Sequence, residues 1–428
     1  MNIIYNIVIY LAPAFLKLAT PFNKKLKLFC QGRKGLVKRI EEDFKEFYKD
    51  PSSKDKKVLW FHCSSVGEFE QARPVIEWFK ANRENAKVVL TFFSPSGYEL
   101  RKNYDKADWV YYLPMDTPGN ARRFIKAINP AKVIFTKYDL WNNFICQADK
   151  NGSELYLISA IFRKKQSFFQ WWGGFFRNML KRFDIIFVQD AESVVNLSRI
   201  GIKKNVFKAG DTRFDRVARI ASESKNFEPI DKFSQDSFTV VAGSSWGPDE
   251  AILQEVIGRI AEEKLIIAPH EIDKERIDKV EQTFKPYGVI KYSYLTEQLN
   301  AGKTQEELTK DCRVLIIDCM GILSALYKYA DFSYIGGGFG VGIHNTLEAA
   351  VYGCPLAFGP KYHKFKEAID LISKGGAVSV NNAEDLYNAI NECVTNKEVC
   401  KAKGEASLKY TQSNLGATKI IVNKIGLL

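Results

Sequence analysis

The chain has 428 residues, 46% of them hydrophobic and 26% charged, which is typical of a globular protein with two or three domains. This composition excludes disordered, collagen-like and disulfide-rich chains. Lys and Arg outnumber Asp and Glu by 62 to 50, and the net charge of +12 predicts an anionic partner: nucleic acid, a membrane surface or a phosphorylated ligand. The eight cysteines have neither CxxC nor metal-binding spacing, so we expect free thiols and no zinc site.

The first 40 residues combine an apolar run with a cluster of cations. Residues 3–16 are mostly apolar, and residues 1–40 contain eight basic side chains and no acidic one. This pattern favours a helix that lies in the interface of an anionic membrane leaflet. A cleaved signal peptide is disfavoured because the cations follow the apolar run and no small-residue cleavage site is present. An amphipathic helix packed on the protein itself is the alternative.

From residue 57 onward, short β-branched or aromatic runs alternate with helical stretches such as 70–82 and 118–128. Alternation of this kind predicts an α/β protein with doubly wound parallel sheets in two Rossmann-like domains that face a cleft. We expect an interfacial segment at 1–40, a first domain at 41–221, a linker at 222–236 and a second domain at 237–428. The last helix is a candidate to pack back on the first domain. Strands are expected at 57–62, 87–93, 107–113, 132–138, 155–161, 184–190, 205–210, 238–243, 264–270, 288–293, 313–318, 332–337 and 354–359.

The motif SSVGE at residues 64–68 lies between the first expected strand and the helix that follows it. Ligands of open parallel sheets bind at the carboxyl ends of strands, and small residues there let backbone amides approach a ligand. Glu68 is a candidate general base for an acceptor hydroxyl. The helix dipole lowers its basicity, so burial would have to raise it again. The alternative is a carboxylate that only stabilises the first helical turn.

A second motif, GGGFGVGIHNTLE at residues 336–348, follows the expected strand at 332–337 and precedes a helix. Five glycines in seven residues exceed what a tight turn needs, so the loop is predicted to bind a phosphate. Asn345 can cap the helix, while Glu348 is either the acid of a capping box or an acceptor for two ribose hydroxyls.

Weaker signals follow other strands of the second domain. His270 can face a leaving phosphate or be an ordinary surface histidine. Other residues placed to face a ligand are Ser244, Ser245, Pro269, Met320 and Gly321.

Residues 160–183 contain six basic side chains, eight aromatic ones and no acid. This mixture suits a membrane interface or a single-stranded nucleic acid, with inward-packing helices as the alternative. Segments 1–40 and 160–183 carry charges of +8 and +6, so the rest of the chain is slightly acidic. The excess charge is therefore local, and we expect an anionic membrane as partner and no nucleic acid.

Several segments together resemble the 3-deoxy-D-manno-octulosonic acid (Kdo) transferase family of lipopolysaccharide synthesis. They are SSVGE, TFFSPSGYE at 91–99, YYLPMD at 111–116, GDTRFD at 210–215, residues 318–337 and GIHNTLEAAVYGCPLAFGP at 342–360. The resemblance implies a GT-B fold, with an acceptor-binding first domain and a CMP-sugar-binding second domain. It implies metal-independent, inverting transfer of Kdo from CMP-Kdo to a lipid IVA-type acceptor, without a cofactor. The implied location is the cytoplasmic face of the bacterial inner membrane, peripheral or monotopic.

The resemblance also assigns residues. Glu68 becomes the general base, and the donor site comprises Ser244, Ser245, Pro269, His270, Met320, Gly321, Gly337, Gly338, Asn345 and Glu348. The acceptor or membrane side comprises Ser65, Gly67, Asp139, Arg163, Lys164 and Lys165.

The chain departs from the family pattern at four places. The usual Glu-Thr-Glu is Lys-Tyr-Asp, so Asp139 is its only acid, and Ile161 replaces an Arg for which Arg163 is a nearby substitute. Trp246 replaces a His, and Ile322 replaces a Glu.

Two other functions remain open from the sequence. One is a GT-B transferase that uses a UDP-sugar and another lipid acceptor, and the other is a non-catalytic membrane-surface protein that binds sugars. Glu348 would bind a ribose in either transferase, so calorimetry with CMP and with UDP distinguishes the donors.

Overall fold

The computed structural model describes residues 2–20, 23–260 and 262–426, which form two compact units. The first unit is Met1–Asp215 with Gly416–Leu428, and the second is Arg216–Leu415. The chain passes from one to the other within α10 (Thr212–Glu223), so the boundary lies ahead of the expected linker at 222–236. That polar segment instead holds the helix α11 (Glu228–Ser234), which buries Ile230 and Phe233.

The first unit contains a parallel seven-stranded sheet in the order β3-β2-β1-β4-β5-β6-β7. All seven strands expected in this part of the sequence are present. Their bounds are β1 (Lys57–Cys63), β2 (Ala86–Phe92), β3 (Trp109–Tyr112), β4 (Lys132–Thr136), β5 (Glu154–Ala160), β6 (Ile185–Val188) and β7 (Val206–Lys208).

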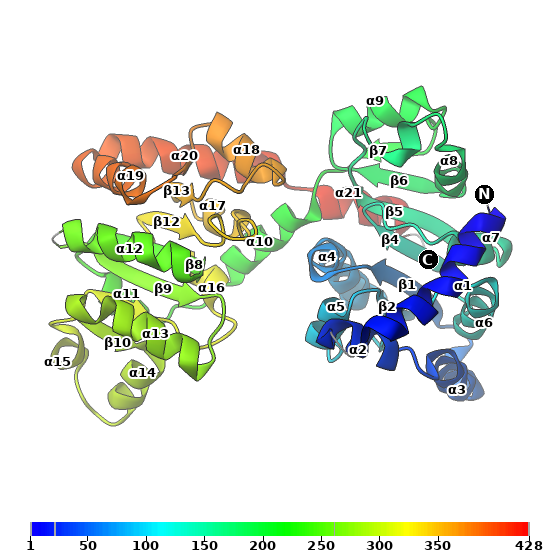
Figure 1. The fold of residues 1–428 in the computed structure, drawn as a ribbon, viewed down its shortest axis with the longest axis horizontal. Helices are drawn as coiled ribbons and strands as arrows, with labels where there is room; N and C mark the ends of the chain where they lie inside the picture. The colour runs from blue at the N-terminus through cyan, green and yellow to red at the C-terminus, as the bar shows by residue number, and fades with distance from the viewer. Residues whose placement is uncertain (1, 21–22, 261, 427–428) are drawn as a thin grey trace. The chain divides into compact units, whose positions relative to one another are not determined.

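Helices cover both faces of this sheet because successive side chains of a buried strand point in opposite directions. In β1, Val58 and Trp60 pack with α3 (Leu36–Lys49), α6 (Pro118–Ile128) and α7 (Asn142–Lys150). Leu59 and Phe61 pack on the other face with α4 (Val66–Asn82) and the last helix, α21 (Ala417–Ile425) (Figure 1). The chain thus returns to the first unit to complete its core. The remaining helices of this unit are α5 (Pro95–Arg101), α8 (Gly174–Leu180) and α9 (Ala191–Arg199), with 3₁₀ turns at Pro51–Ser53 and Ser167–Phe169.

The N-terminal segment forms α1 (Asn2–Ala19) and α2 (Lys24–Gln31), while residues 1, 21 and 22 of the expected interfacial segment lie outside the described residues. The Tyr5 hydroxyl donates to Asp116 at 2.5 Å, and Ile9 is buried, so one side of α1 packs on the first unit. Within the described ranges, no helix combines the length and the hydropathy that a bilayer crossing requires.

The second unit repeats the architecture with the strand order β10-β11-β9-β8-β12-β13-β14, again parallel. Its strands are β8 (Thr239–Ser245), β9 (Lys264–Pro269), β10 (Val289–Lys291), β11 (Val314–Ile316), β12 (Phe332–Ile335), β13 (Leu356–Phe358) and β14 (Ala377–Ser379). The doubly wound α/β class is thereby confirmed. The sequence did not predict β14, because its three residues follow two glycines at the edge of the sheet and form no hydrophobic run.

The helices of the second unit differ widely in length. They are α12 (Gly247–Arg259), α13 (Lys274–Phe284), α14 (Tyr292–Asn300), α15 (Gln305–Thr309), α16 (Leu323–Leu326), α17 (Leu347–Ala350), α18 (Lys366–Ser373), α19 (Ala383–Thr395) and α20 (Lys397–Ser413), with 3₁₀ turns at Lys285–Tyr287 and Tyr327–Tyr329. The helices range from four residues in α16 and α17 to 17 residues in α20.

Candidate functional site

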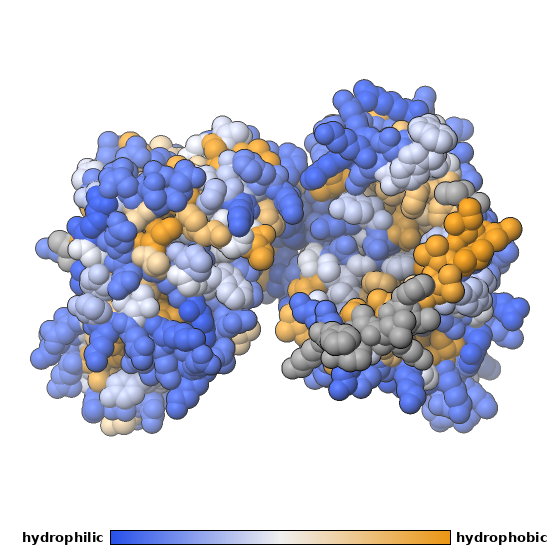
Figure 2. Space-filling view, in the orientation of Figure 1, coloured by the Kyte–Doolittle hydropathy of each residue, from blue (hydrophilic) through white to orange (hydrophobic). Residues whose placement is uncertain are grey.

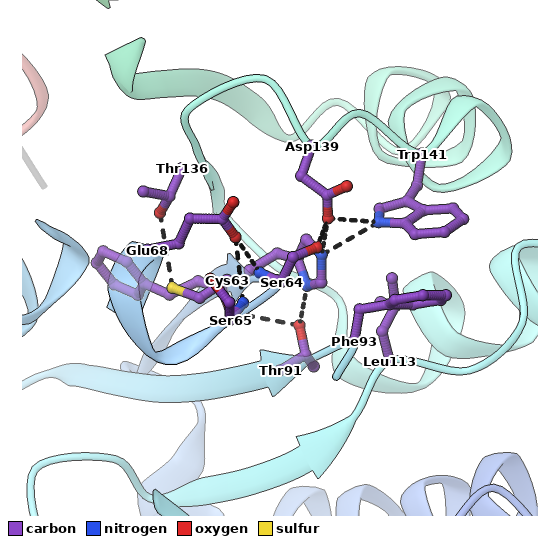
Figure 3. Close-up of polar contacts among 12 residues, drawn as sticks. Cys63, Ser64, Ser65, Glu68, Thr91, Phe93, Leu113, Thr136, Asp139 and Trp141 are labelled. Atoms are coloured by element: carbon purple, nitrogen blue, oxygen red, sulfur yellow. Dashed lines mark hydrogen bonds and ion pairs between the residues drawn. The ribbon is translucent and has the colours of Figure 1, made fainter. Parts of the chain in front are cut away.

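Glu68 lies in the first turn of α4, just beyond the carboxyl end of β1 (Figure 3). Its Oε2 accepts the backbone N–H of Ser65 at 3.2 Å and also that of Ser64. The carboxylate therefore caps the helix, as its first-turn position predicts. Both of these donors bind Oε2, no described residue donates to Oε1, and Figure 3 shows Oε1 directed away from the two amides. One oxygen thus holds the side chain in place and the other is available to a ligand.

The environment of Glu68 raises the pKa of its carboxyl group. Burial is the largest cause and the negative charge of Asp139 adds to it, while His62, Lys137 and the amide of Ser64 act in the opposite direction. Burial therefore outweighs the helix terminus, which by itself would lower the basicity. A carboxylate with a raised pKa next to an open edge of the sheet has the properties of a general base.

Asp139, in the loop after β4, is held next to Glu68 by several donors. Its Oδ2 accepts the Ser64 hydroxyl and the Trp141 indole N–H, the latter at 3.0 Å, and lies 3.1 Å from His62 Nε2. The Trp141 indole N–H also lies 3.2 Å from His62 Nε2, so in the tautomer with the proton on Nε2 both His62 and Trp141 donate to Asp139. The other ring nitrogen, Nδ1, lies 2.9 Å from Thr91 Oγ1. Asp139 is thus a fixed charge at this site.

Sequence reasoning missed His62 and Trp141. His62 is the sixth residue of β1 and is 1% exposed, so in the sequence it reads as part of a buried strand. Its contact with Asp139 exists because β1 and β4 are neighbours in register, with His62 paired to Phe135. Trp141 lies two residues after Asp139. In the sequence, an aromatic residue at this position cannot be distinguished from an ordinary core residue.

Left-handed backbone conformations also occur at these strand ends. Lys137 after β4, Ser159 in β5 and Ser244 in β8 have φ angles of 62°, 53° and 55°, although none is glycine. Such residues cost free energy and cluster at functional sites. Two further non-glycine residues with positive φ, Asn129 and Asp236, precede strands, so three of the five in the described residues lie at the carboxyl edges.

The residues predicted for the acceptor side fall into two groups. Ser65, Gly67 and Asp139 surround Glu68, whereas Arg163, Lys164 and Lys165 are exposed in the loop after β5.

The aromatic residues of 160–183 are partly buried in the core and partly exposed. Phe162, Phe168, Phe175 and Phe183 are buried in the core, as the inward-packing alternative predicts, whereas Trp171 is 90% exposed.

In the second unit, the predicted donor residues lie at the carboxyl edge of the sheet, as residues that end or follow parallel strands must. Ser244 and Ser245 end β8, Pro269 ends β9, and the glycine loop follows β12, all on neighbouring strands. Met320, in the loop after β11, is 72% exposed. The Ser245 hydroxyl is buried and donates to Glu250 at 2.8 Å, so this side chain is committed to the interior of the unit.

Three rings gather at this edge. The Trp246 indole N–H donates to His344 Nε2 at 3.2 Å, and the His270 ring stacks on both, with centroid distances of 4.7 Å and 4.4 Å. Burial lowers the pKa of both imidazoles, that of His344 to about 4. Both rings are thus neutral at pH 7. Trp246, which stands where the family has a histidine, is an integral part of this cluster.

The glycine loop has steric reasons for its composition, in addition to the predicted role in binding. Gly337 has φ +91°, and a Cβ on Gly338 would lie 2.5 Å from the Gly359 nitrogen. Asn345 accepts the Leu347 amide and donates to Glu348 Oε1 at 3.0 Å, so Asn345 and Glu348 are paired. The helix that follows, α17, has only four residues, so its dipole adds little to the binding of an anion at this loop.

Among the residues described, no three His, Cys, Asp or Glu side chains are grouped in a way that could hold a metal ion.

Comparisons with known proteins agree with this picture. Residues 38–216 match the family described as 3-deoxy-D-manno-octulosonic-acid transferase (kdotransferase). A 3-deoxy-D-manno-octulosonic acid transferase from Aquifex aeolicus is 29% identical over 372 residues, which cover 85% of this chain and 93% of that protein. A bifunctional glycosyltransferase/methyltransferase from Fusobacterium nucleatum is 27% identical over 95% of this chain, which spans 61% of that protein.

Among solved structures, the UDP-GlcNAc 2-epimerase from Neisseria meningitidis bound to UDP-GlcNAc has a TM-score of 0.58 at 16% identity. The match covers 86% of this chain and 99% of that one. At this identity the likeness shows the fold, which is of the GT-B type with two parallel-sheet units. Residues 38–216 thus match the Kdo transferase family, and most of the chain is similar to a glycosyltransferase that carries this name.

Proposed function

We propose that this protein transfers Kdo from CMP-Kdo to a lipid A precursor of the lipid IVA type. The observation that carries the proposal is Glu68, a half-buried carboxylate with a raised pKa at the end of a central strand, within the segment that matches the Kdo transferase family. The acceptor binds to the first unit beside Glu68, and CMP-Kdo binds at the carboxyl edge of the second sheet.

The reaction is a single displacement with inversion at the anomeric carbon. Glu68 Oε1 takes the proton of the acceptor hydroxyl while the hydroxyl oxygen forms a bond to the anomeric carbon of Kdo. The bond from that carbon to the phosphate oxygen breaks, and CMP leaves with the electron pair. We assign stabilisation of the departing phosphate to backbone amides of the glycine loop and to the His270 ring, whose neutral form carries one N–H donor. The products are the Kdo-glycolipid and CMP, with the proton first held by Glu68.

A membrane surface is the second part of the proposal, since a lipid acceptor resides in a bilayer. The side of α1 opposite Tyr5 and Ile9 exposes large apolar side chains, visible as the orange band over this helix in Figure 2. Ile3, Ile4, Ile7, Val8 and Leu11 are each more than half exposed. A helical face of this kind next to basic residues favours binding to the cytoplasmic leaflet of the inner membrane.

The test is incubation of the full chain with CMP-Kdo and lipid IVA, followed by mass analysis of the lipid. We expect lipid IVA with one or more added Kdo residues. Calorimetry accompanies the assay and should show binding of CMP in preference to UDP. An unchanged lipid together with preferential binding of UDP would contradict the proposal in favour of a UDP-sugar transferase.

A further inference from the structure

Arg33, in the turn after α2, is a largely buried cation whose hydrogen bonds in the described part of the chain all go to backbone carbonyls. Its Nε donates to Leu113 O at 2.8 Å, Nη2 to Phe93 O at 2.7 Å and Nη1 to Phe29 O at 3.1 Å. The guanidinium carbon lies 3.6 Å from the ring centroid of Phe29, 4.9 Å from that of Tyr112 and 5.0 Å from that of Phe93. Three of its five N–H groups are therefore used, and no carboxylate is among the acceptors.

This environment is unusual for an arginine, because a buried charge is costly when no opposite charge compensates for it. Burial lowers the pKa of Arg33 to about 9, so the group is still a cation at neutral pH. Backbone carbonyls and ring faces solvate the charge only in part. An anion that reaches the two remaining N–H groups would supply the missing opposite charge.

Arg33 lines a pocket of about 480 Å³ next to α1. Pro13, Phe29 and Met115 form apolar walls, Lys34 is the second cation, and none of the described lining residues is acidic. The pocket therefore fits a ligand that carries an anionic group next to an apolar portion. A nucleotide or a free inorganic ion would leave the apolar walls unfilled.

The pocket adjoins the candidate site through contacts within the first unit. The Phe93 ring, which faces Arg33, packs on Trp141 with a centroid distance of 4.5 Å. Trp141 in turn donates to Asp139, and Figure 3 shows Phe93 and Leu113 beside this indole. The ring pair of Phe93 and Trp141 thus lies between Arg33 and Asp139. A ligand in the pocket would therefore lie near the carboxylates that we propose act on the acceptor hydroxyl.

We propose that Arg33 and this pocket bind a phosphate group of the acceptor lipid, with the adjoining acyl portion against the apolar walls. The inference rests on the proposed function, since it assigns a subsite to the acceptor. It commits to the phosphate of the acceptor, and not to that of a bilayer phospholipid, because Arg33 is linked to Asp139 through the contacts of Phe93 and Trp141.

The experiment combines a change in the protein with a change in the lipid, because Arg33 also holds the ends of β2 and β3 in place. Transfer is measured in neutral detergent with lipid IVA and with each of its two monophosphoryl forms, for the wild type, Arg33→Gln and the control Lys38→Met. Lys38 is an exposed cation of α3 outside the pocket, 3.6 Å from Glu42. Binding of lipid IVA without donor is measured in parallel, and melting temperatures report folding.

For the wild type and Lys38→Met, we expect removal of one of the two phosphates to raise KM by about tenfold or more. For Arg33→Gln, the KM should be high and the same with or without that phosphate. The inference would be overturned if Arg33→Gln raised KM by the same factor for all three lipids. It would also be overturned if removal of either phosphate left the KM of the wild type unchanged. If Arg33→Gln does not fold, Arg33→Lys replaces it and should show a smaller ratio of the two KM values than the wild type. Phosphate-dependent binding of lipid IVA without any transfer would support the subsite and contradict the proposed function.

Discussion

Glu68 has two roles, as the cap of α4 and as the proposed general base. The first favours a low pKa of its carboxyl group and the second a high one. As a cap, its Oε2 accepts two amide donors at the positive end of α4, which stabilises the anion. As a base, it must bind a proton, and burial together with the charge of Asp139 raises its pKa. Because Asp139 is fixed by its own donors, its charge acts on Glu68 from a constant position.

Replacement of Asp139 by Asn should therefore change the pH dependence of transfer. Loss of the negative neighbour favours the charged form of Glu68, which lowers its pKa, so the acid limb of kcat/KM should shift to lower pH. The rate on the plateau should fall because a base with a lower pKa removes a proton less readily. The measurement is kcat/KM between pH 4 and 8. The control Asp105→Asn removes an exposed acid of the same unit and should leave the acid limb of kcat/KM at its wild-type pH. An acid limb that does not move in Asp139→Asn would contradict the argument.

Two substitutions at His62 test whether its contact with Asp139 matters, because the side-chain amides of Gln and Asn occupy the positions of different ring nitrogens. The Gln amide nitrogen reaches the position of Nε2 and can still donate to Asp139, whereas the Asn amide ends near Nδ1. We expect His62→Gln to retain kcat within about tenfold and His62→Asn to lose more than that. Melting temperatures and the acid limb of kcat/KM separate a folding defect from misplacement of Asp139. Equal activity of the two variants would show that the contact of Nε2 with Asp139 does not matter.

At the scale of elements, α1 has two faces with different partners. Tyr5 and Ile9 face the first unit, and the Tyr5 ring also packs on Phe175 of α8 with a centroid distance of 5.3 Å. The opposite face exposes Ile4, Ile7 and Leu11 and packs on no core. The docked face fixes the helix on the unit that holds Glu68, so the exposed face would bring this unit to a lipid surface.

The triple variant Ile4→Asn, Ile7→Asn, Leu11→Asn should weaken binding to vesicles that contain phosphatidylglycerol by about tenfold or more, since three apolar side chains no longer enter the interface. Cosedimentation measures the bound fraction. Leu100→Asn, a change at an exposed leucine of α5, is the matched control and should bind as the wild type does. Unchanged sedimentation of the triple variant would show that this face of α1 does not bind the membrane.

At the scale of the whole molecule, the sequence predicted the architecture better than the site. Thirteen of the fourteen strands in the described residues were expected, because buried parallel strands are continuous apolar runs. Glu68 could be found because it directly follows such a run. His62 and Arg33 could not, since their roles depend on which segments lie side by side: His62 meets a loop from β4, and Arg33 meets the ends of β2 and β3. In the sequence, Arg33 is one of eight basic residues in a segment whose charge favours a membrane surface, and nothing in that pattern distinguishes it from the other seven.

The central claim is that Glu68 removes the proton of the acceptor hydroxyl while the second unit binds the donor. The most direct test is Glu68→Gln in the full chain, because Gln has the size of Glu and an oxygen that can still cap α4. We predict that this variant binds CMP-Kdo with wild-type affinity in calorimetry and transfers Kdo to lipid IVA at least about 10²-fold more slowly. Transfer at a near-normal rate would contradict the claim and would make Asp139 the next candidate for the base.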